Sequence, residues 1–111
     1  MRTITINYKE LVEALAKLDE EDPQRTRGDI DLLLENINNH LKKFLKDGIL
    51  KIVEKKGRIY VGGELITDDV YTIWPEQWGK ASTSTKMYRQ IWNSLEFAKS
   101  IGIYEKVFSE T

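Results

Sequence analysis

The sequence predicts a small α+β domain that combines a short N-terminal strand, helices, a β-hairpin and an additional C-terminal helix. Three observations predict this class: runs with apolar residues at every second position, longer runs with apolar residues at every third or fourth position, and glycines at the breaks. A chain of 111 residues is long enough for one core and too short for two ordinary domains. We therefore expect one domain over 1–111, with a strand, two helices and the hairpin in 1–62 and a helical extension in 63–111.

The N-terminal part of the chain is predicted to form a strand and then a helix. Threonine and isoleucine alternate over residues 2–6, which is the period of a half-buried strand. Asn7 is a residue type that caps helices, and the apolar residues after it fall at helical spacing. The stripe expected to be buried comprises Leu11, Val12, Leu15, Ala16 and Leu18. Residues 19–28 contain several acids, a proline and a glycine and are predicted to form a loop.

A second helix is predicted to follow that loop. Thr26 and Asp29 have the spacing of a capping box, and the apolar periodicity then runs without a break over residues 29–47. The positions on its apolar face are Ile30, Leu33, Leu34, Ile37, Leu41, Phe44 and Leu45. Gly48 is predicted to be the left-handed residue that ends this helix.

The remaining elements are a hairpin, a long helix and a short tail. Residues 49–54 and 58–61 are rich in β-branched and apolar residues, and the intervening Lys-Lys-Gly predicts a turn between two strands. Residues 67–74 are consistent with a short capped helix. The helix after residues 82–85 is expected to bury Tyr88, Ile91, Trp92, Leu95 and Ala98, and residues 102–108 are expected to form a last short strand.

Composition narrows the class of protein. Hydrophobic residues make up 41% of the chain and charged residues 32%, with both signs mixed, which is typical of a folded globular protein. No window has the roughly 18 apolar residues that a membrane span needs, and the start lacks the apolar core of a signal peptide. Because cysteine is absent, disulfides and thiolate metal sites are excluded. We expect a cytoplasmic protein with no membrane contact, cofactor or metal.

The formal net charge is −1, so bulk electrostatics alone does not indicate a polyanionic partner. The distribution of charge is more informative, because residues 8–35 are mainly acidic and residues 40–58 are mainly basic. Within 40–58, seven lysine and arginine residues face only Asp47 and Glu54. We therefore expect a dipolar molecule with one basic surface.

The basic segment carries a resemblance to a known family. The order of a lysine-rich helix, Gly48, an apolar strand and Gly57-Arg58 resembles the recognition helix and wing of winged helix-turn-helix domains, over residues 38–61. The resemblance implies a helix in the major groove of DNA and a wing on the phosphates. By position, the groove residues are Asn38, Asn39, Lys42, Lys43 and Lys46, and the wing residues are Lys55, Lys56 and Arg58. The sequence departs from the family at residues 29–47, which are predicted to form one helix instead of two helices joined by a tight turn. The first helix of the motif would then be residues 8–18, and a loop would take the place of the turn.

A second stretch, residues 76–96, resembles a helix-turn-helix with a hydroxyl-rich start to its second helix. Such a helix N-terminus favours a phosphate. Ser84 belongs to this N-terminus, and the residues expected on the exposed face are Lys86, Arg89, Gln90 and Asn93. The same helix, with Trp92, Leu95 and Phe97, is the candidate surface for a homodimer.

These observations favour a non-catalytic protein that binds double-stranded DNA, most simply a small transcriptional regulator acting as a homodimer. The alternative is a protein-interaction module, such as an inhibitor or adaptor of the kind that phages and mobile elements encode. A third hypothesis is a metal-dependent nuclease, because Glu54-Lys55-Lys56 has the Glu-x-Lys pattern of nuclease cores. The second carboxylate would then come from Asp47 or from the group Glu64, Asp68 and Asp69.

Overall fold

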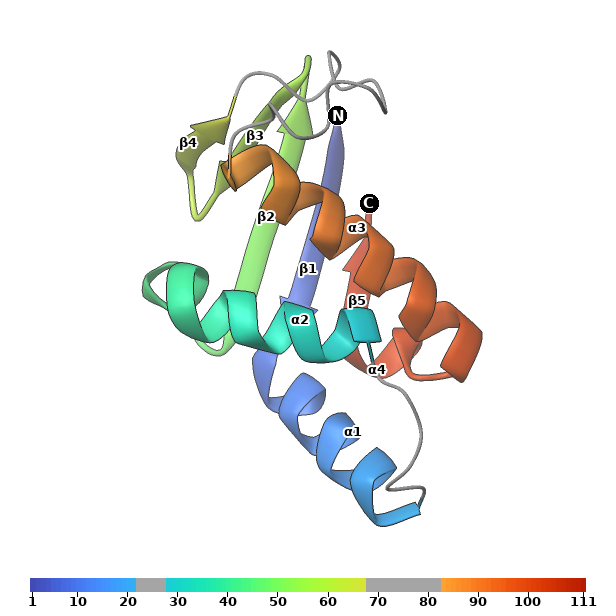
Figure 1. Cartoon of the computed structure of the whole chain (residues 1–111). Helices are drawn as coiled ribbons and strands as arrows, with labels where there is room; N and C mark the ends of the chain where they lie inside the picture. Colours follow the sequence, from blue (N-terminus) through green and yellow to red (C-terminus); the bar gives the residue numbers. More distant parts are fainter. Residues whose placement is uncertain (22–27, 68–82) are drawn as a thin grey trace.

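The predicted α+β class is confirmed by a computed structural model, which describes residues 1–21, 28–67 and 83–111. In chain order the elements are β1 (Arg2–Asn7), α1 (Tyr8–Glu21), α2 (Gly28–Asn36), the π-helical turn η1 (Ile37–Leu41), the 3₁₀ turn η2 (Lys42–Phe44), β2 (Ile49–Lys55), β3 (Arg58–Val61), β4 (Glu64–Thr67), α3 (Thr83–Ile101), α4 (Tyr104–Val107) and β5 (Phe108–Glu110). The five strands form one antiparallel sheet in the order β4-β3-β2-β1-β5 (Figure 1).

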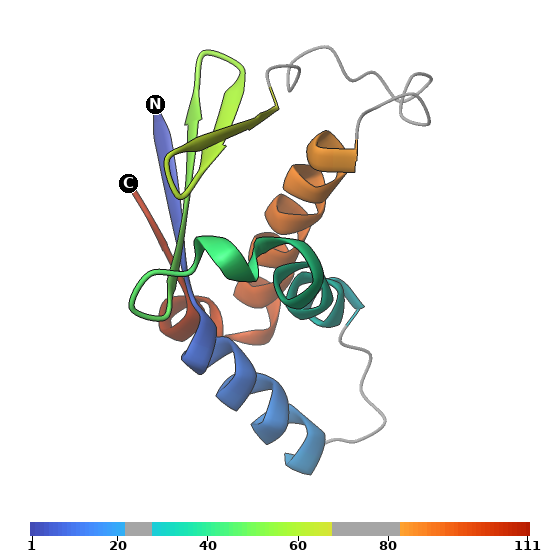
Figure 2. The same ribbon diagram turned by 90° about the vertical axis from the view of Figure 1, so that its left-hand side faces the viewer.

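The described helices α2 and α3 lie against one face of the sheet, and α1 extends beyond the end of β1 (Figures 1 and 2). The core forms between these two layers from side chains that are almost completely buried: Ile4 and Ile6 of β1, Leu50 and Ile52 of β2, Ile30, Leu33 and Ile37 of α2 and η1, and Ile91 and Leu95 of α3. In the described part of the chain, no element lies on the opposite face of the sheet, as the view in Figure 2 makes plain.

The N-terminal predictions are confirmed in outline. Strand β1 forms as expected, and Asn7 caps α1 by accepting a hydrogen bond from the Glu10 amide at 3.0 Å. The buried stripe of α1 is narrower than predicted, because Val12 is 39% exposed and Ala16 is also on the surface. The helix continues to Glu21, inside the segment predicted as a loop. The proposed capping residue Thr26 lies outside the described residues.

The predicted helix over 29–47 exists but ends early. Residues 28–44 are helical throughout, widening into η1 and tightening into η2, and Leu45 is already extended. Gly48 does not end the helix, which corrects the prediction. Lys46 and Ile49 exchange two backbone hydrogen bonds of 3.0 and 2.9 Å, with Asp47 and Gly48 between them at φ +53° and +76°. Asp-Gly is the preferred pair for such a two-residue turn, because both positions need a positive φ.

Two further turns of the same type build the sheet. Lys56 and Gly57, at φ +52° and +78°, join β2 to β3, so the predicted hairpin is confirmed. Gly62 and Gly63, at φ +59° and +87°, join β3 to β4. The segment after residue 62 is thus more than the helical extension that was predicted, since it supplies both edge strands of the sheet.

The C-terminal segment closes the fold. Helix α3 buries Tyr88, Ile91, Leu95 and Ala98 as predicted. The expectation of a strand over 102–108 is wrong, because the helical turn α4 occupies most of it and β5 begins only at Phe108. No described helix is long and apolar enough to cross a membrane. The short helix expected over 67–74 falls largely on 68–82, outside the described residues.

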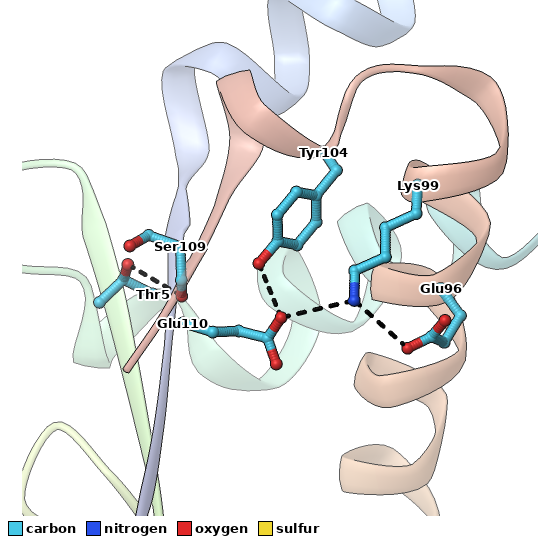
Figure 3. A network of polar contacts seen from close by, with 6 residues as sticks. All are labelled: Thr5, Glu96, Lys99, Tyr104, Ser109 and Glu110. Atoms are coloured by element: carbon cyan, nitrogen blue, oxygen red, sulfur yellow. Dashed lines mark hydrogen bonds and ion pairs between the residues drawn. The ribbon is translucent and has the colours of Figure 1, made fainter.

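A polar network holds β5 against its neighbours (Figure 3). The Tyr104 hydroxyl donates to Glu110 Oε2 at 2.6 Å, and Lys99 Nζ lies 3.6 Å from the same oxygen and 3.7 Å from Glu96 Oε1. The hydrogen bond to Glu110 is the main cause that raises the pKa of Tyr104 to about 12, with smaller contributions from burial and from the charge of Glu110. The network therefore links the edge strand to α3 and α4.

Candidate nucleic-acid interface

The uncovered face of the sheet, called the open face below, follows from the strand pattern. Successive side chains of a strand point to opposite faces, and Ile4 of β1 pairs with Ile52 of β2 on the helix side. The residues between these core positions therefore lie on the open face. Its members are Thr3 and Thr5 of β1, Lys51, Val53 and Lys55 of β2, Arg58 and Tyr60 of β3, Leu65 of β4 and Ser109 of β5.

An apolar row crosses the middle of the open face. The register places Val53 of β2 opposite Tyr60 of β3, and Tyr60 opposite Leu65 of β4. Val53 and Tyr60 are half-buried, and Leu65 is 49% exposed at the edge of the sheet. The row thus offers one aromatic ring flanked by two aliphatic side chains.

Exposed cations lie on both sides of this row. Lys51 is opposite Thr5 on one side, and Lys55 is directly opposite Arg58 on the other. Within the part of the chain that the structure describes, none of the three forms an ion pair, and no carboxylate lies at an open-face position. Because like charges directly opposite each other destabilise a sheet, the Lys55 and Arg58 pair favours an anion between its two head groups.

Lys46 extends this surface toward the other end of β2. It forms an isolated bridge with Ile49, whose side chain shares the orientation of Lys51, and it is exposed. Among the predicted site residues, the structure therefore brings Lys46, Lys55 and Arg58 to one face. Lys51 and Tyr60 also lie on the open face, although they are not among the site residues predicted from the sequence. The signal was present in the sequence, because Lys51, Val53 and Lys55 alternate with the core residues of β2.

The predicted groove residues do not join the wing residues. Asn38 and Asn39 of η1 and Lys42 and Lys43 of η2 are exposed, but they precede the start of β2 whereas Lys55 ends it. Turns η1 and η2 continue α2 on the helix side of the sheet, where Phe44 of η2 lies next to Gly62, whereas Lys55 and Arg58 lie on the opposite, open face. The cations of residues 40–58 therefore do not form the one basic surface that was expected.

Asn38 has a hydrogen-bond partner within the fold, and Lys56 lines a cavity away from the open face. The Asn38 Oδ1 atom accepts a hydrogen bond of 2.6 Å from the Tyr8 hydroxyl, so part of its hydrogen-bonding capacity is already used. Lys56 leaves the open face and lines a polar cavity of about 300 Å³ on the helix side, together with Arg2 and Glu54. Of the three predicted wing residues, only Lys55 and Arg58 therefore belong to the open face.

Glu54 and Arg2, which line the polar cavity, also form contacts within the fold. The Tyr88 hydroxyl of α3 donates to Glu54 Oε2 at 2.7 Å, and the Arg2 guanidinium lies 4.4 Å above the Trp92 ring. Burial, followed by the hydrogen bond to Glu54, raises the pKa of Tyr88 well above its usual range. In residues 1–21, 28–67 and 83–111 there is no group of three His, Cys, Asp or Glu side chains able to hold a metal. Asp68 and Asp69 of the nuclease hypothesis lie outside these residues.

The second predicted stretch is only partly described. Gln90 is not a surface residue of α3: its Nε2 donates to the Asp29 carbonyl at 2.6 Å, and its Oε1 accepts from Asn36 Nδ2 at 3.1 Å. The prediction that Gln90 contacts DNA is therefore wrong, because both ends of its amide join α3 to α2. Arg89 and Asn93 are exposed on α3. Ser84 and Lys86 belong to the first turns of α3, but their side chains are outside the described part, as are residues 76–82.

The helix face expected to form a dimer contact is largely used within the chain. Leu95 is completely buried in the core, and Trp92 and Phe97 are half-buried against it.

Comparison with models of protein families, with curated proteins and with solved structures finds no match to this chain. Its function is therefore inferred from the geometry of the described residues.

Proposed function

We propose that this chain is a non-catalytic DNA-binding protein and that the open face of the sheet is its binding surface. The observation that carries the proposal is the placement of Lys51, Lys55 and Arg58 on one face without a carboxylate, in a chain whose net charge is −1. Phosphate contacts from such cations supply most of the sequence-independent affinity for DNA. A chain with balanced charge needs its cations gathered in this way to bind a polyanion.

The open face replaces the mode of binding that the resemblance to winged helices implies. In that mode Asn38, Asn39, Lys42 and Lys43 would contact bases and Lys55 and Arg58 would contact phosphates, yet the first group belongs to turns on the helix side of the sheet and the second to the open face. A role in transcription and a homodimer stay predictions. They are consistent with a small DNA-binding domain, which gains affinity when two copies bind together.

The test is fluorescence-anisotropy binding to labelled single-stranded and duplex oligonucleotides at two salt concentrations. We expect binding that weakens with salt, and we expect Lys55→Gln combined with Arg58→Gln to weaken it further, because both phosphate contacts and their counterion release are lost. Binding of neither oligonucleotide at low salt contradicts the proposal. Unfolding of the variant is checked by circular dichroism, and no loss is expected because the substitution removes a like-charge pair.

A protein-interaction module is the second candidate, and the exposed edge of the sheet favours it. Among the described strands, β4 has a neighbour on one side only, and its Leu65 is 49% exposed. An edge strand of this kind can pair with an extended segment of another protein. The expected result for this candidate is co-purification of one stoichiometric protein partner that Leu65→Asp abolishes. Retention of the partner by this variant counts against pairing at β4.

A further inference from the structure

We propose that the DNA bound by the open face is single-stranded and that one base stacks on Tyr60. This inference rests on the proposed function and adds the form of DNA and the residue that selects it. It uses an aromatic side chain that is absent from the residues predicted from the sequence.

The open face is too wide to enter the major groove of undistorted duplex DNA. Five strands lie side by side, so the face is about 19 Å wide, whereas the major groove of DNA is about 12 Å wide. A duplex lying on this face would offer phosphates only and would leave the apolar row without a partner. A single strand exposes the flat surfaces of its bases, which an apolar row can cover.

Tyr60 has the position and chemistry of a stacking platform. It lies in the centre of the row, between Val53 and Leu65, on a strand that is internal to the sheet. Its hydroxyl has no hydrogen-bond partner in the described residues, although the side chain is half-buried. A tyrosine side chain on a rigid strand loses little conformational entropy when a base stacks on its ring.

The cations are spaced to hold the backbone on either side of a stacked base. Lys51 and Lys55 are each two residues from Val53 along β2, so they lie about 7 Å to either side of the apolar row. Arg58 adds a second cation beside Lys55. A strand whose base covers Tyr60 therefore has a cation available for the phosphates that precede and follow that base.

The experiment compares a labelled oligothymidine of about 15 nucleotides with a duplex of the same length, a size that covers the usual site of one small domain. We expect the wild type to bind the single strand at least about 10-fold more tightly. Tyr60→Leu, which keeps an apolar side chain beside Val53 and Leu65, is expected to weaken single-strand binding about 5- to 100-fold. Tyr60→Phe keeps the ring and is expected to remain within about 2-fold of the wild type.

The outcomes separate this inference from the proposed function. Equal or tighter binding of the duplex overturns the single-strand preference, and unchanged affinity of a folded Tyr60→Leu overturns the stacking role. Either result leaves DNA binding by Lys55 and Arg58 standing if their double variant still loses affinity. If neither oligonucleotide binds the wild type, both the inference and the proposed function fail.

Discussion

Gly62 links the 3₁₀ turn to the sheet, and replacing it is predicted to loosen that contact. It is the first central residue of the β3–β4 turn, at φ +59°. Asp47 and Lys56 occupy the same position in the other two turns at φ +53° and +52°, so the backbone there accepts a side chain. A Cβ atom on Gly62 would lie 3.1 Å from Phe44 Cδ1 and 3.2 Å from Phe44 Cβ. Glycine is needed at this turn because Phe44 covers it.

Two contributions determine the expected loss of stability for Gly62→Ala. The left-handed conformation costs an alanine about 1 to 2 kcal/mol. Displacing Phe44 adds about 1 to 3 kcal/mol, which is the usual cost of overpacking. The sum is about 2 to 5 kcal/mol. Gly63→Ala is the matched control, because a Cβ there meets nothing within 4 Å and only the backbone cost, about 1 to 2 kcal/mol, applies.

Urea unfolding followed by circular dichroism measures both free energies of unfolding. Gly62→Ala is expected to lose more stability than Gly63→Ala, and in a Phe44→Ala background the loss from Gly62→Ala is expected to shrink by about 1 kcal/mol or more. The shrinkage is partial because one of the close contacts is with Phe44 Cβ, which alanine retains. Equal losses for the two glycines, or full additivity with Phe44→Ala, refute the reasoning.

Two further predictions concern the helix side of the sheet. Gln90→Leu is expected to destabilise the fold by about 1 to 3 kcal/mol in urea unfolding, because the Asp29 carbonyl and the Asn36 amide lose their hydrogen-bond partner. Asn93→Ala, on the exposed side of α3, is the control and is expected to change the free energy of unfolding by less than about 0.5 kcal/mol. A similar cost for both changes contradicts the bridging role of Gln90. The raised pKa of Tyr104, about 12 against 10.0 when unfolded, contributes stability that is present below pH 10 and is lost as the pH rises toward 12. Tyr104→Phe is expected to flatten this alkaline loss in unfolding experiments, and an unchanged pH profile counts against the hydrogen bond to Glu110.

The elements with clear periodicity were predictable from the sequence. Alternation predicts β1, and apolar runs on either side of Lys-Lys-Gly predict β2 and β3. Apolar spacing predicts α1, α2 and α3, because one buried face imposes that pattern. Strands β4 and β5 have only four and three residues, too few for alternation to stand out. Gly48 was misassigned because a glycine after an apolar helix fits a helix end as well as it fits an Asp-Gly turn.

The candidate site was less predictable, because it depends on strand pairing. Lys55 and Arg58 were recognised as a basic turn, but adjacency in sequence does not show which face a side chain occupies. Alternation along β2 indicates Lys51, but only the register places Tyr60 beside these cations, and only the structure shows that Lys56 lies on the helix side. Gln90 was misjudged for a related reason. A polar side chain between core positions of a helix is expected to be exposed, unless a second helix offers backbone and amide partners.

The central claim, that the open face binds DNA, is tested most directly by two variants of equal charge. One combines Lys51→Gln with Lys55→Gln on the open face, and the other combines Lys42→Gln with Lys43→Gln on η2. The measurement is the slope of log affinity against log salt for a single-stranded oligonucleotide. The open-face variant is expected to lose about 1.4 from the magnitude of this slope, since each phosphate contact contributes about 0.7, while the η2 variant keeps the wild-type slope. A slope that falls only in the η2 variant, or equally in both, contradicts the claim.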